Sequence, residues 1–249
     1  TMTFALGAAA VAEYAAKPFV RAALQSPSKP GSVLSFFLGV DYDSPNASDA
    51  LREGHYVHDM QKLWFGGGEE YDALCLPFCE TIREAGNEQL CDDWWHTTID
   101  GKVSQLILCD QLSRNCFRGD DEAFAYDDCS LGIARSLADC SILETKQSDL
   151  TGEFYPPYAT FVIMAMMHSE SSNDHETCLE VLEWASEKAP QLDHWWDGQR
   201  KFELEHKEVI DKFGRYPYRN KKKGRESTKE ELEWLANVDK LPGWAKSQV

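Results

Sequence analysis

The clearest structural signal in the chain is the segment KVSQLILCDQLSRNCFRG, residues 102–119. Its middle is strongly apolar at Leu106–Leu108, and polar residues recur at helical spacing around it. That pattern predicts an α-helix from Lys102 to Cys116, and Gly119 is a residue that ends helices. The apolar centre predicts that one face of this helix is buried.

The same helical period continues through most of the chain after Gly54, whereas the alternation typical of β-strands is nearly absent. Paired helices with short connectors predict an all-α fold of helical hairpins, packed as an irregular solenoid or bundle. Ser227 and Glu230 have the spacing of a capping box for the last helix. The expected helices cover residues 59–63, 69–85, 102–116, 120–138, 156–168, 174–188, 194–213 and 227–238.

The first forty residues differ from the remainder. Residues 1–24 contain nine alanines, and Glu13 is the only acidic residue before Asp41. Residues 26–31 form a Ser/Pro/Gly-rich break. This composition is typical of organelle transit peptides, so we expect an N-terminal arm over 1–40, left after import as a docking segment, and a helical domain over 41–249. The alternative is an additional helix on the surface of that domain.

Composition and charge narrow the function classes. The chain has 249 residues, 43% of them hydrophobic, which is enough for a substantial core and excludes general disorder. No uncharged apolar run reaches the roughly 18 residues of a membrane span. The net charge of −17 argues against nucleic-acid binding. Residues 200–225, however, carry ten basic and four acidic side chains; this basic band either folds back on the acidic body or receives an anionic ligand.

The eight cysteines are scattered, without a C-x-x-C pair or the Cys/His spacing of zinc sites. They resemble small buried hydrophobic residues and favour a reducing compartment. His168, Glu170 and His175 are poorly spaced for a metal, and no phosphate loop, dinucleotide fingerprint or nucleophile triad is present. We therefore expect neither a metal, nor a cofactor, nor an identifiable catalytic residue.

Three clusters contain the residues able to carry chemistry. Asp110, Arg114 and Arg118 are four residues apart and so lie on one helical face, where Arg114 can pair with Asp110. The second cluster follows a Met-rich helix, and the third spans the basic band. The candidate polar residues are Asp110, Gln111, Arg114, Asn115, Arg118, His168, Glu170, His206, Arg215, Arg219, Asn220 and Arg225.

These clusters carry a resemblance to a known family. The chain is similar to the "domain of unknown function 924" family over roughly residues 55–240. The matching motifs are Trp64-Phe65-Gly66; Leu108-Cys109-Asp110-Gln111 with Arg114-Asn115 and Arg118-Gly119; Ala123-Phe124-Ala125 with Asp127; His168-Ser169-Glu170; His206 with Ile210, Phe213-Gly214-Arg215, Pro217 and Arg219-Asn220; and Gly224-Arg225-Glu226-Ser227-Thr228 with Glu231.

The departures from the family pattern are few. Ser113 stands where a proline is usual, Tyr218 where a histidine is usual, and residues 221–223 are lysines in place of a mostly apolar stretch. The resemblance implies an all-helical fold similar to tetratricopeptide repeats. It implies no activity, because none is established for the family.

Two functions from different classes remain open. The first is a non-catalytic assembly or linker subunit that binds protein partners through the N-terminal arm and the helical surface. We expect such a subunit to be soluble, in an organelle such as the plastid or alternatively in the cytoplasm, and able to associate peripherally with a membrane. The second is an enzyme or binding protein for a small anionic metabolite, held by arginines beside a histidine. A third interpretation of the same clusters is a buried polar network that fixes the helical hairpins.

Overall fold

The computed structural model describes residues 7–141, 149–221 and 223–246. Within them the secondary structure is helical, with no β-strand, which confirms the all-α prediction. Stacking of the hairpins as tetratricopeptide-like repeats stays a prediction. The helices are α1 (Ala8–Ala16), α2 (Pro18–Gln25), α3 (Ser32–Leu38), α4 (Ala47–Glu53), α5 (Tyr56–Gly66), α6 (Gly68–Cys75), α7 (Cys79–Gly86), α8 (Trp94–Thr97), α9 (Ile99–Leu106), α10 (Ser113–Cys116), α11 (Asp127–Ser141), α12 (Ala159–Met167), α13 (Ser172–Lys188), α14 (Asp193–Phe213), α15 (Lys229–Ala236) and α16 (Gly243–Lys246).

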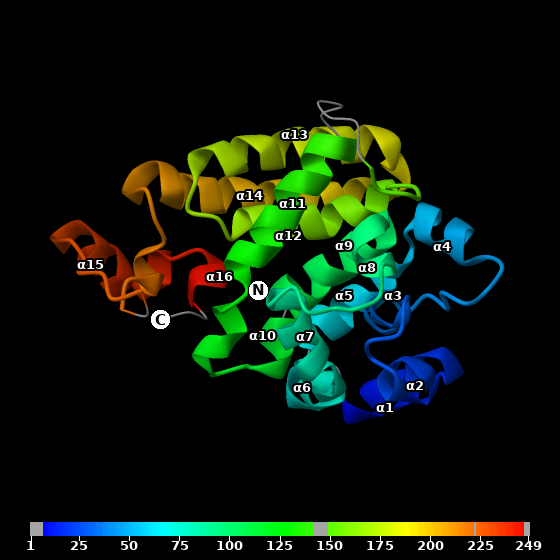
Figure 1. The fold of residues 1–249 in the computed structure, drawn as a ribbon. Coiled ribbons are helices and arrows are strands. Elements are labelled where there is room, and N and C mark those ends of the chain that lie inside the picture. Colours follow the sequence, from blue (N-terminus) through cyan, green and yellow to red (C-terminus); the bar gives the residue numbers. More distant parts are fainter. Residues whose placement is uncertain (1–6, 142–148, 222, 247–249) are drawn as a thin grey trace.

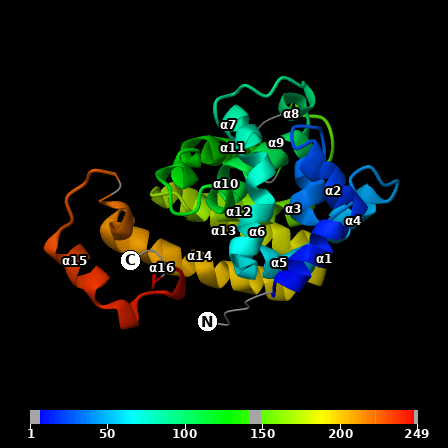
Figure 2. The same ribbon diagram turned by 90° about the horizontal axis from the view of Figure 1, so that it is seen from below.

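The largest packed unit is formed by α11, α12, α13 and α14, each of which contacts the next (Figure 1). The apolar α12 is almost entirely buried between its neighbours. α14 is the longest helix and extends beyond this unit toward the C-terminal end of the molecule (Figure 2). It ends where expected, because Gly214 adopts a left-handed conformation with φ of 67°.

Two of the predicted helices are interrupted. The helix expected over 69–85 is divided into α6 and α7 by a 3₁₀ turn at Leu76–Phe78, where Pro77 lacks the amide hydrogen that a continuous helix needs. The helix expected over 102–116 consists of α9, a π-helical turn at Ile107–Leu112 and α10. All six residues of the π-helical turn are buried. Such turns occur frequently at functional sites.

The N-terminal segment belongs to the main hydrophobic core. Every residue of α3 is buried, because five of its seven side chains are large and apolar. Phe36 stacks on Tyr71 and Phe37 on Trp64, whose indole nitrogen donates a 2.9 Å hydrogen bond to the Phe37 carbonyl. The structure thus places α3 in the core, whereas α1 and α2 lie on its surface and bury two side chains each. A docking role for this segment stays a prediction.

Residues 214–221 and 223–246, the C-terminal lobe, form a smaller unit against the end of α14 (Figure 2). It has its own apolar cluster, in which Tyr216, Trp234 and Trp244 pack on α14. The capping box of α15 uses Thr228 and Glu231, one residue later than Ser227 and Glu230. Ser227 instead accepts a hydrogen bond from the Asn220 side chain.

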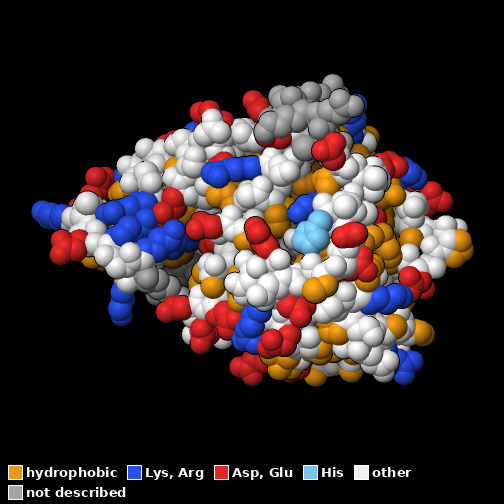
Figure 3. Space-filling view, in the orientation of Figure 1, with side chains coloured by type: hydrophobic (Ala, Val, Ile, Leu, Met, Phe, Trp, Pro, Cys, Tyr) orange, Lys and Arg blue, Asp and Glu red, His pale blue; other side chains and the backbone are white. Residues whose placement is uncertain are grey.

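The basic band runs from the end of α14 into the C-terminal lobe, and lysine and arginine side chains gather on that side of the molecule (Figure 3). Acidic side chains are scattered over the rest of the visible face (Figure 3). Among the described residues, no helix has the length and apolar character needed to cross a membrane.

Candidate functional site

A cavity of about 350 Å³ lies where the C-terminal lobe meets the main body. The described residues contribute three arginines and two histidines to its walls but no carboxylate, in a chain whose net charge is −17. Clefts between packed units are the usual position of small-molecule sites. The lining residues are Arg114, Arg118, Gly119, Ala123, Phe124, His168, His206, Tyr218, Arg219 and Trp244.

His168 is held by a carboxylate from the π-helical turn. Its Nδ1 lies 2.8 Å from Oδ1 of Asp110, which is 1% exposed and also accepts a hydrogen bond from the Gln111 side chain. Burial alone would raise the pKa of Asp110, but the charges of His168 and Arg114 and the hydrogen bonds from His168 and Gln111 bring it well below the usual range. Asp110 is therefore ionised, and His168 Nδ1 carries the proton it donates. Nε2 is left as the nitrogen available to a ligand in the cavity.

Arg114 links Asp110 to α11. Its Nη1 donates to the Asp110 carbonyl oxygen at 2.6 Å, and its Nη2 donates to Oδ1 of Asp127 at 2.9 Å. The guanidinium carbon lies 5.3 Å from the centre of the Phe124 ring. Arg114 Nη2 is also 3.2 Å from His168 Nδ1, but that nitrogen already carries a proton, so this approach is a contact and not a hydrogen bond.

Arg219 is the cationic residue of the cavity that is most buried, with 8% of its surface exposed. Its Nη1 donates to the His168 carbonyl at 2.8 Å, while its buried Nε has no hydrogen-bond partner. An unpaired buried N–H costs about 1–3 kcal/mol, more when it is charged. Arg219 Nε is therefore a buried donor for which no described residue supplies a well-placed acceptor.

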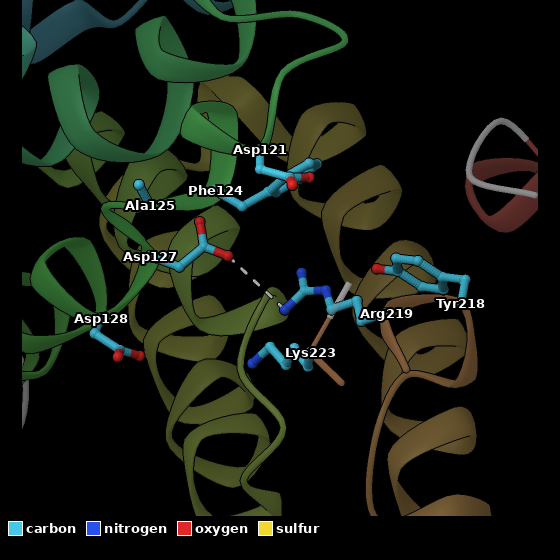
Figure 4. A pocket seen from close by; sticks show the side chains of 8 residues that line it. All are labelled: Asp121, Phe124, Ala125, Asp127, Asp128, Tyr218, Arg219 and Lys223. Atoms are coloured by element: carbon cyan, nitrogen blue, oxygen red, sulfur yellow. Dashed lines mark ion pairs between the residues drawn. The ribbon is translucent and has the colours of Figure 1, made fainter. Parts of the chain in front are cut away.

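A second cavity, of about 300 Å³, shares Phe124, Tyr218 and Arg219 with the first (Figure 4). Its remaining walls include Lys223 and three aspartates, and Figure 4 shows Arg219 extending toward Asp127, 3.9 Å away. The two cavities therefore differ in charge. The first is lined by basic groups, and the second has carboxylates at Asp121, Asp127 and Asp128.

His206 is the second histidine of the cavity and has a different role. Its Nδ1 donates to the Phe202 carbonyl at 2.7 Å, and its ring stacks on Trp244 with centroids 3.8 Å apart. Burial lowers the pKa of His206 to about 3. The ring is therefore neutral near pH 7, and its Nε2 can only accept a hydrogen bond.

The turn that carries His168 is fixed from several sides. The buried His175 donates to the Ser169 carbonyl and to Glu203, at 3.0 and 2.7 Å. Glu170 accepts two hydrogen bonds from Arg225, at 2.6 and 2.9 Å, and one from the Tyr216 amide. These contacts hold His168 at the cavity and fasten the C-terminal lobe to the main body.

The structure divides the twelve candidate residues. Seven lie at the cavity or directly behind it: Asp110, Gln111, Arg114, Arg118, His168, His206 and Arg219. The other five lie outside its lining and make ion pairs or hydrogen bonds. These are Asn115 with Asp72, Glu170 with Arg225, and Arg215 and Asn220 with Glu231. Arg118 lines the cavity and also binds Asp72, with Nη2 3.0 Å from Oδ1.

Several residues of the site were not among the candidates. Phe124 and Asp127 belong to the Ala123-Phe124-Ala125…Asp127 motif, which could have pointed to them. Tyr218, where the family usually has histidine, forms part of the cavity wall. Trp244 and Asp72 have no signal in the sequence, because their contacts depend on packing between distant segments. In the part of the chain that the structure describes, no three His, Cys, Asp or Glu side chains are placed to hold a metal ion.

A family model described as "Bacterial protein of unknown function (DUF924)" matches residues 47–239. The chain belongs to this family. Every cavity residue except Trp244 lies within the matched range of this DUF924 protein. A solved structure, that of a protein of unknown function from Agrobacterium tumefaciens, is similar with a TM-score of 0.54 and 21% identity, over 76% of this chain and 98% of that one. This similarity concerns the fold alone. No curated protein sequence matches the chain.

Proposed function

We propose that this DUF924 protein binds a small anionic metabolite in the 350 Å³ cavity, and that His168 exchanges a proton with it. The observation that carries the proposal is Arg219, a buried cation in the lining of a cavity to which the described residues contribute no carboxylate. Guanidinium groups bind carboxylate and phosphate oxygens through such N–H donors.

The His168–Asp110 pair supplies the second half of the proposal. A carboxylate that accepts the Nδ1 proton fixes the tautomer of the ring and stabilises its protonated form, so that Nε2 can take up a proton and return it. Arg219 binds the backbone carbonyl of the same histidine. The anion-binding group and the proton-exchanging group therefore share one rigid support, as acid–base chemistry on a bound anion requires.

The assembly-subunit function expected from the sequence relied on the N-terminal arm and on the helical surface. α3 of that arm is buried in the main core, whereas most residues of α1 and α2 are exposed. The plastid location rested on composition alone. Of the two functions, only anion binding is supported by a specific structural feature, the basic cavity.

Calorimetric titration of inorganic phosphate and of acetate tests the proposal. Wild type is expected to bind at least one of them, and Arg219→Gln to lose about tenfold or more in affinity, as for a lost charged hydrogen bond. Arg200→Gln is the matched control, because Arg200 lies on α14 outside the cavity lining, is 36% exposed and pairs with Glu183. Equal affinity in wild type and Arg219→Gln would overturn the proposal, as would no binding by wild type.

Proton exchange is tested in the same titration. Repeating it in buffers of different ionisation enthalpy measures the protons taken up on binding. We expect proton uptake on binding in wild type and its loss in His168→Asn, with Arg200→Gln unchanged. Identical uptake in wild type and His168→Asn would show that another group exchanges the proton.

A further inference from the structure

The cavity has an aromatic wall as well as a basic one. Phe124, His206, Tyr218 and Trp244 account for four of its ten lining residues. They come from separate elements: a 3₁₀ turn before α11, α14, a second 3₁₀ turn after α14, and α16. Tyr218 and Trp244 lie with ring centroids 6.1 Å apart at 68°, and Trp244 is stacked on His206. Convergence of rings from four segments is not a consequence of local sequence.

Two of the arginines lie over these rings. The Arg114 guanidinium lies over Phe124 at 5.3 Å, and that of Arg219 lies over Tyr218 at 5.7 Å. A guanidinium can make a cation–π contact through its face and still donate hydrogen bonds from its edge. The anion-binding donors and the aromatic faces are therefore adjacent parts of one surface.

The volume of the cavity is enough for a ring and an anionic group together. An apolar cavity of about 150 Å³ holds one benzene ring, and this cavity has about 350 Å³. The adjoining cavity carries Asp121, Asp127 and Asp128, which would repel a second negative group. The anionic group is thus confined to the arginine side, and the remainder of the ligand lies against the aromatic wall.

We infer that the ligand is an aromatic oxyanion, with a phosphate or carboxylate at Arg219 and a flat ring against Tyr218 and Trp244. This inference rests on the proposed anion-binding function and specifies its ligand class. Aromatic stacking adds to the hydrophobic gain of burying the ring. An aryl anion should therefore bind more tightly than an alkyl anion with the same charged group.

Two pairs of ligands isolate the contribution of the ring: phenyl phosphate against methyl phosphate, and benzoate against acetate. We expect the aryl member of at least one pair to bind wild type about tenfold more tightly. Tyr218→Leu and Trp244→Leu should reduce this preference to about threefold or less while leaving the affinity for methyl phosphate or acetate nearly unchanged. Phe213→Leu is the control, because Phe213 packs in the same lobe but does not line the cavity.

The outcomes distinguish a failure of this inference from a failure of the proposed anion binding. If methyl and phenyl phosphate bind equally, and acetate and benzoate do too, the aromatic inference is overturned and anion binding stands. If none of the four binds wild type, the anion-binding function itself fails. If the aryl preference persists in both Tyr218→Leu and Trp244→Leu, the ring binds elsewhere and the inference is overturned. As a further check, 4-carboxyphenyl phosphate should bind less tightly than phenyl phosphate, and tighter binding would contradict the placement of the ring.

Discussion

Replacement of Glu170 by glutamine should weaken the attachment of the C-terminal lobe to the turn that carries His168. Glu170 accepts two hydrogen bonds from Arg225 and one from the Tyr216 amide, and its side chain is only 18% exposed. The variant keeps the shape of the side chain but leaves Arg225 without its counter-charge. Removing one partner of a well-buried ion pair is strongly destabilising.

The size of the expected loss in stability follows from the pKa of the Glu170 carboxyl. Burial alone would raise the pKa of Glu170, but the hydrogen bonds from Arg225 and Tyr216 and the charge of Lys223 lower it from 4.5 to about 2. This interval corresponds to about 3 kcal/mol of folding free energy at pH 7. Because the pKa is lowered in the folded protein, the contribution is complete above pH 4.5 and is lost as the pH falls toward 2. At pH 3 roughly 1.5 kcal/mol remains.

Urea unfolding of wild type and Glu170→Gln at pH 7 and pH 3 measures this contribution. We expect the variant to be less stable by about 3 kcal/mol at pH 7 and by about half as much at pH 3. Glu183→Gln is the matched control: Glu183 pairs with Arg200 but is 64% exposed, so its loss should cost less than about 1 kcal/mol. A loss in Glu170→Gln no larger than in the control, or one that does not change with pH, would refute the reasoning.

Three further predictions concern the core and the site. Phe36→Ala should lower the free energy of unfolding by about 3–5 kcal/mol. Phe65→Ala should change it little, because that side chain is 62% exposed. Equal effects of the two variants in urea unfolding would contradict the packing of α3 in the core. Asp110→Asn should lower the free energy of unfolding by about 3 kcal/mol, because it removes the buried charge that accepts the His168 proton and one of the two carboxylates paired with Arg114. Wild-type stability in this variant would show that Asp110 is not ionised. His206 should keep its neutral ring signals in NMR from pH 8 down to about pH 4, since its pKa is about 3. Because the unfolded chain binds this proton near pH 6.5, the residue should also destabilise the fold increasingly as the pH falls below that value.

The helices were predictable because they depend on local sequence. Apolar residues recur at helical spacing along α14, so the sequence predicts this helix, and Gly214 ends it as expected. Ser227 and Thr228 both precede a glutamate by three residues. Which of the two becomes the cap depends on Asn220, a residue of a neighbouring turn that binds Ser227.

The candidate site could be predicted in part. The four-residue spacing of Asp110 and Arg114 correctly predicted their pairing, with Arg114 Nη2 3.3 Å from Asp110 Oδ1. The π-helical turn that carries Asp110 could not be predicted, because it reflects the packing around buried residues and not their period. Tertiary packing also determines the burial of α3 and the position of Trp244 at the cavity. No spacing rule connects Trp244 with His206, 38 positions earlier in the sequence.

The most direct test of the anion site is the NMR signal of the Arg219 Nε–H group during a phosphate or benzoate titration. This signal can be assigned by its absence in Arg219→Lys. Because Nε is buried and unpaired in the structure, we predict that its proton resonance moves downfield to saturation as the anion binds, in parallel with the His168 ring signals. An Arg219 resonance that stays in place while either anion saturates the protein would show that the anion binds elsewhere, and would contradict the proposed site.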